Sequence, residues 1–438
     1  MFGTSGIRGV VGEAVTAETA LSVGRALGAE GDRVVVGRDP RESGELLLDS
    51  ATAGLRESGT DVVDLGIAAT PTIARAVDWY DADAGVAVTA SHNPSEDNGL
   101  KLWQPSGQAY DSAGQDRIEK RIEADQYDLS AWDELGSRES ADATERHVGI
   151  LVEAAGGEGE LDLDVAVDLG NGAGSVSVEA LIEAGARVET LNAQPDGRFP
   201  GRPSEPTAEN CTALSTLVEA GEYDLGIAHD GDADRMRAVA GDGTYLTGDA
   251  LLALFAAEAS RSGDRVAVPV DTSLAVEDFL ADRGVEVVRT PVGDVYVAEA
   301  ATASDVAFGG EPSGAWIWPD ETLCPDGPLA AIRIASMAAE EPLEDRLREI
   351  PSYPIRRTSI ETAEKGVVME RIESRVIERY ESVETLDGVR VSTDEGWFLI
   401  RASGTQPLVR LTAEARTASA ADALVTEARE VIQAALEE

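Results

Sequence analysis

Three stretches of the chain follow one plan, and that plan decides the fold. They read RVVVGRDPRESGELLLDSATAGLRESGTDVVDLG at 33–66, DVAVDLGNGAGSVSVEALIEAGARVETLN at 164–192 and RVAVPVDTSLAVEDFLADRGVEVVRTPVG at 265–293. Each begins with an apolar strand, passes through a polar turn and an amphipathic helix of about a dozen residues, and returns through a glycine-containing turn to a second strand. Strands that alternate with helices indicate βαβ units on a mainly parallel sheet. The sequence therefore predicts three α/β domains of related architecture.

The C-terminal part follows a different plan. After Pro351 and Pro354, the pattern predicts a short strand, a helix over 364–380, three strand-like runs within 388–415 and a terminal helix over 419–436. Strands that are adjacent in sequence pair antiparallel, which indicates a small α+β domain. We therefore expect four domains, at 1–150, 151–250, 251–352 and 353–438.

The composition excludes several classes of protein. The 438 residues are 43% apolar, so the chain can bury a core in each domain and is not disordered. Its 82 Asp and Glu against 36 Lys and Arg give a net charge of −46, and such a surface repels nucleic acid and anionic membranes. We expect neither as a partner. The composition is similar to that of cytoplasmic proteins from salt-accumulating halophiles.

Targeting and redox signals are absent from the sequence. Cys211 and Cys324 lie far apart and belong to no C-x-x-C pair, so we expect neither a disulfide framework nor a zinc site. The N-terminal MFGTSGIRGVVGEAV has no basic region before an apolar run, and no stretch approaches the length of a membrane span. We expect a cytoplasmic protein, monomeric or homodimeric.

The stretch VAVTASHNPSEDNGLKLW at 86–103 begins as a strand and then continues into a loop that carries a serine. Ser91 follows the strand directly, and we expect it to be exposed there, either as a nucleophile or as part of a surface turn. The G-x-S-x-G pattern of a hydrolase elbow is absent. Lys101, one of only three lysines in the chain, lies ten residues further on.

An aspartate-rich loop lies in YDLGIAHDGDADRMRAVAGDG at 223–243. Asp230, Asp232 and Asp234 follow an apolar strand at two-residue spacing, so in extended backbone their carboxylates share one face. Three such oxygen ligands suit Mg²⁺, although a solvated acidic turn has the same pattern. An EF-hand is excluded because the positions of its Gly and its final Glu hold Arg and Gly here. Arg235 offers a cation to a carboxylate and to a phosphate.

Two further loops carry polar side chains around glycines. In FGGEPSGAWIWPD at 308–320, Glu311 and Ser313 can bind the neighbouring hydroxyls of a sugar, or form an ordinary loop. In FLIRASGTQPLVRLTAE at 398–414, a strand–loop–strand pattern gathers hydrogen-bond donors that suit a phosphate, or forms a plain hairpin. These donors are Arg401, Ser403, Gly404, Thr405 and Arg410.

Taken together, the four loops resemble those of the α-D-phosphohexomutase superfamily over essentially the whole chain. SHNP, DGDxDR, GExSG and SGT occur in the order of that family, and FGTSGIRG at 2–9 is similar to its opening. The resemblance implies four domains around a central cleft and an enzyme that interconverts hexose 6-phosphate and hexose 1-phosphate. It also implies one Mg²⁺, a phosphoserine, and a hexose 1,6-bisphosphate as intermediate or activator.

The resemblance also implies roles for individual residues. Ser91 is the expected phosphoserine, and Asp230, Asp232 and Asp234 are expected to hold Mg²⁺ together with it. The residues expected beside the reacting phosphate are Arg8, Lys101, Arg235 and His92, with Lys101 a candidate for proton transfer and His92 a base or a phosphate contact. The expected sugar contacts are Glu311 and Ser313. The expected grip on the other phosphate consists of Arg401, Ser403, Gly404, Thr405 and Arg410.

Three details favour the phosphoglucosamine mutase branch of the superfamily, namely SHNPSEDNG, RTPVGDVYV at 289–297 and PLVR after the phosphate loop. The alternatives are a phosphoglucomutase/phosphomannomutase of broad specificity and a sugar-phosphate binding protein without catalysis. The second alternative is disfavoured because the serine, the aspartates and the arginines are all present. Two positions depart from the usual pattern: Ala315 stands where many members have His, and Gln406 where an acidic residue is usual.

Because the surface of the protein is expected to be strongly acidic, a high salt concentration should raise both its activity and its stability. Raising KCl from about 0.1 M to about 1 M shortens the Debye length from about 10 Å to about 3 Å, which screens the self-repulsion of an acidic surface. We predict a higher melting temperature and a faster turnover at molar KCl, measured by thermal denaturation and by initial rates across a KCl series. An optimum of both at the lowest salt would contradict this prediction.

Overall fold

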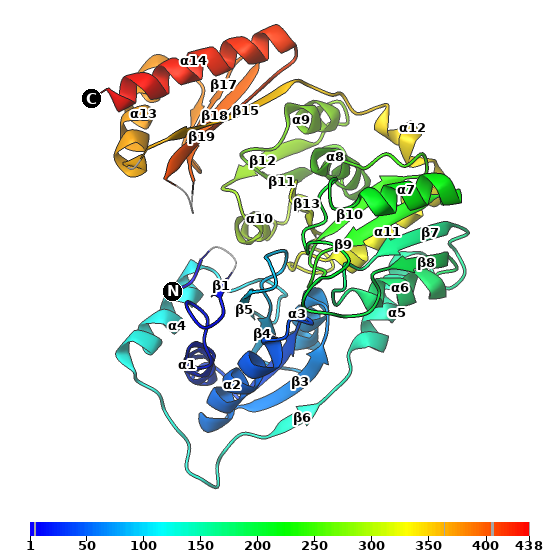
Figure 1. Cartoon of the computed structure of the whole chain (residues 1–438), viewed down its shortest axis with the longest axis vertical. Coiled ribbons are helices and arrows are strands. Elements are labelled where there is room, and N and C mark those ends of the chain that lie inside the picture. The colour runs from blue at the N-terminus through cyan, green and yellow to red at the C-terminus, as the bar shows by residue number, and fades with distance from the viewer. Residues whose placement is uncertain (4–5, 363, 404–406, 438) are drawn as a thin grey trace.

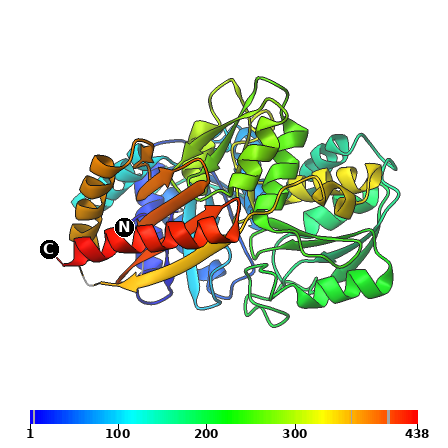
Figure 2. The ribbon, with the colours of Figure 1, turned by 90° about the horizontal axis from the view of Figure 1, so that it is seen from above.

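Four β-sheets follow one another along the chain in an arc in this computed structural model, which describes residues 1–3, 6–362, 364–403 and 407–437 (Figure 1). Seen from above, the helix at the C-terminus lies on the same side of the molecule as the N-terminus (Figure 2). Within the described part of the chain, no helix is both long and apolar enough to cross a membrane. The predicted α/β architecture with an antiparallel C-terminal sheet is confirmed.

The first unit has a six-stranded sheet in the order β1-β5-β4-β2-β3-β6. Its strands are β1 (Ile7–Val10), β2 (Arg33–Arg38), β3 (Asp61–Ile67), β4 (Ala84–Val88), β5 (Asp97–Trp103) and β6 (Arg138–Ser140). Its helices are α1 (Ala17–Gly28), α2 (Gly44–Glu57), α3 (Thr70–Trp79) and α4 (Ser112–Ala124).

The second and third units each have a four-stranded sheet. The second contains α5 (Thr144–Ala154), β7 (Asp164–Asp168), α6 (Ser175–Glu183), β8 (Arg187–Leu191), α7 (Thr212–Gly221), β9 (Leu225–His229) and β10 (Met236–Ala240). The third contains α8 (Gly248–Ala259), β11 (Arg265–Pro269), α9 (Leu274–Ala281), β12 (Glu286–Thr290), α10 (Asp294–Ala300), β13 (Val306–Glu311) and β14 (Ala315–Ile317). The next two helices are α11 (Gly327–Glu340), which packs back onto the second unit, and α12 (Leu343–Leu347).

The fourth unit is an antiparallel sheet in the order β15-β19-β18-β17-β16, covered by two helices. Its elements are β15 (Ile355–Glu361), α13 (Lys365–Arg379), β16 (Val383–Glu384), β17 (Val389–Ser392), β18 (Gly396–Ala402), β19 (Leu408–Ala415) and α14 (Ala418–Leu436). The predicted helix over 364–380 and the terminal helix over 419–436 correspond to α13 and α14.

The three repeated stretches produce the same topology three times. In each, the two strands of the repeat pair in parallel, as β2 with β3, β7 with β8 and β11 with β12. A third strand then pairs in parallel with the first strand on its other side, as β4, β9 and β13 do. An antiparallel strand follows next to the third strand, as β5, β10 and β14. The connection between the third strand and this antiparallel strand is therefore the same structural position in all three units.

That shared connection carries three of the four sequence motifs. The β4–β5 connection contains Ser91, and the β9–β10 connection contains Asp230 to Asp234. The β13–β14 connection contains Ser313, two residues after Glu311, which ends β13. In α/β sheets the carboxyl ends of parallel strands are where ligands bind. The fold thus places these motifs at equivalent functional edges.

The boundaries between the units remain a proposal. Positions 150 and 250 fall within α5 and α8, whereas 352 lies between α12 and β15. The second and third units also share one continuous hydrophobic core, which includes Ile227, Phe255, Phe308 and Trp316. We therefore expect these two units to unfold together.

The fourth unit docks on the third through a buried carboxylate. Glu414 of β19 is fully buried and accepts hydrogen bonds from Ser273 Oγ (2.6 Å), Leu274 N (2.7 Å) and Trp397 Nε1 (2.9 Å). Ser273 and Leu274 begin helix α9, so the carboxylate lies at a helix N-terminus, where negative charge is favoured. Arg390 adds a second buried link by donating to Val270 O (2.8 Å).

Replacing Glu414 by Gln should weaken this docking. The glutamine amide cannot accept all three hydrogen bonds, and it turns an NH₂ group toward groups that are themselves donors. The free energy of unfolding should therefore fall by about 2–4 kcal/mol. We predict a lower urea midpoint, followed by tryptophan fluorescence because Trp397 lies at the junction. The exposed Glu395→Gln serves as the matched control. Equal midpoints for the two variants would contradict the assigned role of Glu414.

Candidate active site

Ser91 lies at the meeting point of the first and second units. Its backbone is left-handed (φ 52°), and its side chain is fully buried. Its hydroxyl donates to Asp230 Oδ2 (2.6 Å) and lies 3.3 Å from Asp234 Oδ1. The expectation that Ser91 is exposed is therefore wrong, because the aspartate loop of the second unit covers it. A residue held in this sparsely populated conformation is typical of functional sites.

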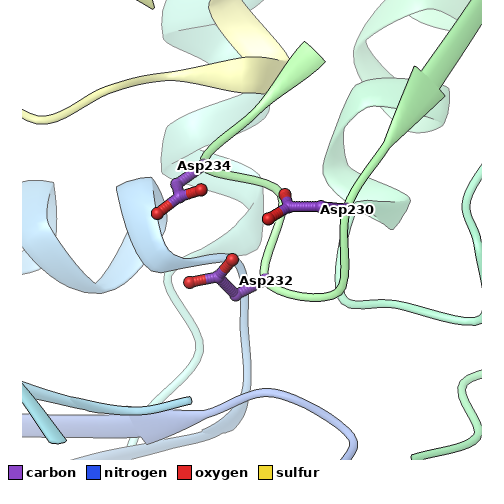
Figure 3. Close-up of side chains that lie close together, drawn as sticks. All are labelled: Asp230, Asp232 and Asp234. Carbon is purple, nitrogen blue, oxygen red and sulfur yellow. The ribbon is translucent and has the colours of Figure 1, made fainter. Parts of the chain in front are cut away.

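The three aspartates converge on one point (Figure 3). All three are buried, and each offers a carboxylate oxygen within 4.8 Å of the others. The predicted extended backbone is wrong, since β9 ends at His229 and the following residues form a turn in which Ala233 has φ 56°. The turn wraps the carboxylates around a common centre instead of aligning them along a strand.

Burial and mutual repulsion dominate the electrostatics of this cluster. Burial raises the pKa of Asp230 well above its usual range, and the charges of Asp234 and Asp232 add to the rise. For Asp232, burial acts in the same direction, but the Lys101 ammonium and the Thr70 hydroxyl outweigh it and lower its pKa. The cluster therefore needs cations in order to hold all three carboxylates ionised.

Lys101 is the cation in direct contact with the cluster. It is buried on β5, and its Nζ bonds Asp232 Oδ2 (3.1 Å) and Asp234 Oδ2. Burial opposes its charge, but these two carboxylates outweigh burial and raise its pKa. Lys101 is thus an ammonium in this arrangement, able to neutralise charge and to give up a proton but not to accept one.

The other residues expected beside the reacting phosphate lie around the same point. Arg8 of β1 interacts electrostatically with Asp232, Lys101 and His92, and its buried Nε has no hydrogen-bond partner among the described residues. His92 Nδ1 lies 3.3 Å from Ser91 Oγ, and burial together with nearby cations lowers its pKa to about 2. His92 is therefore neutral.

The sugar loop adjoins the aspartate loop. The backbones of Arg235 and Ala315 form an isolated antiparallel β-bridge, and Met236 N donates to Gly314 O (3.1 Å). The second and third units are therefore joined here. Glu311 is buried and accepts a hydrogen bond from Ser313 Oγ (2.6 Å). The structure thus brings the expected sugar-binding pair next to the aspartates.

The phosphate loop is only partly described. Arg401 and Arg410 are cross-strand neighbours on β18 and β19, and Arg401 pairs with Asp387 (2.6 Å). Ser403 is buried, whereas Gly404, Thr405 and Gln406 lie outside the described residues. Among the described residues, no hydrogen bond or ion pair joins Arg401 or Arg410 to the other three loops. The role of this loop as a phosphate grip stays a prediction.

Sequence reasoning missed several residues that hold the site together. Thr70, at the start of α3, donates from its hydroxyl to Asp232 Oδ2 (2.7 Å) and from its backbone N–H to Asp232 O (2.8 Å). Ser204 donates to Ser91 O (2.9 Å) and accepts from Gly231 N (3.0 Å). No local sequence pattern predicts the role of either residue, because each forms its hydrogen bonds with a loop that is far away in sequence.

The residues present fit a divalent cation. Asp232 Oδ2 is held by Thr70 and Lys101, while its other oxygen, Oδ1, is buried and has no hydrogen-bond partner within the residues that the structure describes. An orphaned buried carboxylate oxygen beside two further carboxylates and the Ser91 hydroxyl provides the hard oxygen donors that Mg²⁺ prefers.

The comparisons with known proteins agree with this geometry. The chain matches the phosphoglucomutase/phosphomannomutase models for alpha/beta/alpha domains I (1–128), II (147–243) and III (247–353) and for the C-terminal domain (360–431). The chain therefore belongs to the phosphoglucomutase/phosphomannomutase family, within the α-D-phosphohexomutases.

Similar proteins extend over its whole length. A probable phosphoglucosamine mutase of Methanococcoides burtonii is 43% identical over 440 residues, covering 100% of this chain and 99% of that protein. One of Methanopyrus kandleri is 44% identical, covering 100% and 98%. A crystal structure of a phosphoglucomutase/phosphomannomutase family protein from Burkholderia thailandensis superimposes with a TM-score of 0.87 at 27% identity, covering 99% and 98%.

Replacing Asp230 by Asn should stabilise the metal-free protein and weaken its metal site. The change removes a buried charge that repels two neighbours, whereas the amide oxygen can still accept from Ser91. We predict a higher melting temperature in EDTA and a smaller rise on adding Mg²⁺, since a bound ligand stabilises by about 2.7 kcal/mol at a hundredfold excess over its Kd.

The exposed Asp282→Asn provides the matched control for this experiment. It should leave both melting temperatures unchanged. An Asp230→Asn protein that gains as much from Mg²⁺ as the wild type does would contradict the assignment of the cluster as a metal site.

Proposed function

We propose that the chain is a phosphoglucosamine mutase, which interconverts glucosamine 6-phosphate and glucosamine 1-phosphate through a phosphoserine at Ser91. The observation that carries the proposal is the placement of the Ser91 hydroxyl on Asp230, inside a cluster of three buried carboxylates and Lys101. Full-length relatives described as probable phosphoglucosamine mutases support the choice of substrate.

The proposed reaction consists of two phosphoryl transfers at Ser91. The bond between phosphorus and Ser91 Oγ breaks as a new bond forms between phosphorus and the anomeric hydroxyl oxygen of glucosamine 6-phosphate. The product is a 1,6-bisphosphate of the sugar. The bisphosphate then reverses its orientation in the site and transfers its 6-phosphoryl group to Ser91 Oγ, which leaves glucosamine 1-phosphate. In each transfer the leaving oxygen gains a proton and the attacking hydroxyl loses one. Lys101, an ammonium in contact with the carboxylates that bracket Ser91, is the proposed group that gives its proton to the leaving oxygen and, once neutral, takes the proton of the attacking hydroxyl.

Charge neutralisation is the main contribution of the site. Phosphoryl transfer depends on positioning and on stabilising charge over the phosphoryl oxygens. Mg²⁺, held by Asp230, Asp232 and Asp234, would supply Lewis-acid stabilisation of that group. Arg8 and Arg235 are proposed to bind the phosphoryl oxygens, and His92 to contact them as a neutral donor.

The remaining loops are proposed to orient the sugar. Glu311 and Ser313 would accept and donate hydrogen bonds to its hydroxyls from the edge of the aspartate loop. Arg401, Ser403 and Arg410, with Gly404 and Thr405, would hold the phosphate that does not react. We propose that these groups meet in a central cleft, where alternation of the two phosphates needs room for the bisphosphate to turn.

The setting of the enzyme is proposed from composition. We propose a cytoplasmic location in a salt-accumulating cell, with the phosphorylated hexose as partner and a monomer or homodimer as the assembly.

A substrate panel tests the proposed function. In molar KCl with Mg²⁺, we predict that glucosamine 6-phosphate is converted to its 1-phosphate faster than glucose or mannose 6-phosphate, as followed by ³¹P NMR. Ser91→Ala should abolish turnover of all three because it removes the acceptor oxygen. A preference for glucose or mannose would favour a phosphoglucomutase/phosphomannomutase, and absence of any turnover would favour a binding protein without catalysis.

A further inference from the structure

Arg41 is a buried arginine that binds one loop almost exclusively. Its side chain is fully buried, yet among the described residues its only carboxylate partner is Asp39, at 2.9 Å from Nε. Its remaining donors point to backbone oxygens of the serine loop, namely Ser91 O (2.8 Å), Asn93 O (2.7 Å), Asp97 O (2.8 Å) and Pro94 O. Four carbonyls of a seven-residue stretch thus converge on one guanidinium.

Burying this ion pair is not an efficient way to stabilise a fold. Two charges lose their hydration, and replacing a buried pair with apolar residues is often neutral or stabilising. What the planar guanidinium supplies is a rigid set of donors with fixed directions. Phe199 of the second unit packs over its face at 5.0 Å, which holds the guanidinium in place.

Thr89 connects the same ion pair to the other side of Ser91. Its hydroxyl donates to Asp39 Oδ2 (2.7 Å) and accepts from Ser91 N (2.8 Å). The carbonyl of Ser91 accepts from Arg41 and from Ser204 Oγ (2.9 Å). Both backbone polar groups of Ser91 are therefore fixed by one buried network.

This network accounts for the unusual backbone of Ser91. A left-handed conformation costs a non-glycine residue about 1–2 kcal/mol, so it persists only where the surroundings determine it. With φ at 52°, the hydroxyl points to Asp230 of the second unit. A relaxed backbone at Ser91 would move Oγ off the carboxylates.

We propose that Arg41 and Thr89 are positioning residues for the mutase reaction, which hold Ser91 in its left-handed conformation and so aim Oγ at the transferring phosphoryl group. The inference rests on the proposed function. Both residues are fully buried and act through the backbone of Ser91.

Thr89→Val tests this inference with little change in shape. The variant loses the hydroxyl that links Asp39 to Ser91 N, and we expect kcat to fall about a hundredfold, since a misplacement of about 1 Å costs that much. KM for the hexose phosphate should change little, because the groups proposed to bind the sugar are untouched. Thr89→Ser, which keeps the hydroxyl, should restore most of kcat.

Thr52→Val is the matched control, because Thr52 is a buried threonine of the same unit whose hydroxyl has no hydrogen-bond partner in the described part of the chain. It should leave kcat unchanged. Should Thr89→Val fail to fold, Ser204→Ala provides the second test, since it removes a donor to Ser91 O, and it too should lower kcat more than it raises KM.

The outcomes separate the two proposals. An active wild type with a Thr89→Val variant as fast as Thr52→Val would overturn the positioning role alone. A loss in Thr89→Val that Thr89→Ser does not reverse would also overturn it, because the hydroxyl would then not be the cause. A wild-type chain inactive on every hexose phosphate would overturn the proposed function, and the positioning role with it.

Discussion

Three carboxylates buried within 4.8 Å of one another, beside a serine hydroxyl, set the constraint on which the rest of the structure depends. Such a cluster is unstable unless cations balance it, because each charge has lost its hydration and repels the others. Lys101 is supplied by the first unit and Arg235 by the second, and the orphaned oxygen of Asp232 leaves a place for a metal. Within a strongly acidic chain, these two cations lie beside the buried carboxylates.

The repeated topology explains how loops from separate units reach this point. Each of the first three units presents the connection between its third strand and the antiparallel strand beside it, and the first three motifs occupy that connection. One architecture therefore serves three chemical purposes, with the difference confined to a few loop residues. The fourth unit differs in fold and is fixed to the third by Glu414 and Arg390.

The sequence predicted the repeats and the motifs well, because strand and helix periodicity is local and the motifs have fixed spacing. It did not predict that Ser91 is buried, since burial results from a loop 139 positions away. It also gave no sign of Thr70, Ser204 or Arg41, whose hydrogen bonds go to distant backbone or side chains. The aspartates were predicted to come together in an extended strand, whereas a turn gathers them into a cluster that could hold a metal ion.

The fate of one phosphoryl group tests the central claim most directly. Protein isolated with phosphate on Ser91 is about 80 Da heavier than the unmodified chain. It would be mixed with a slight excess of glucosamine 6-phosphate and Mg²⁺ in molar KCl and followed by intact mass and ³¹P NMR. The account predicts that the extra mass leaves the protein as a glucosamine 1,6-bisphosphate forms and returns to the protein as glucosamine 1-phosphate appears. Mutase turnover by protein that never carries phosphate on Ser91 would contradict it.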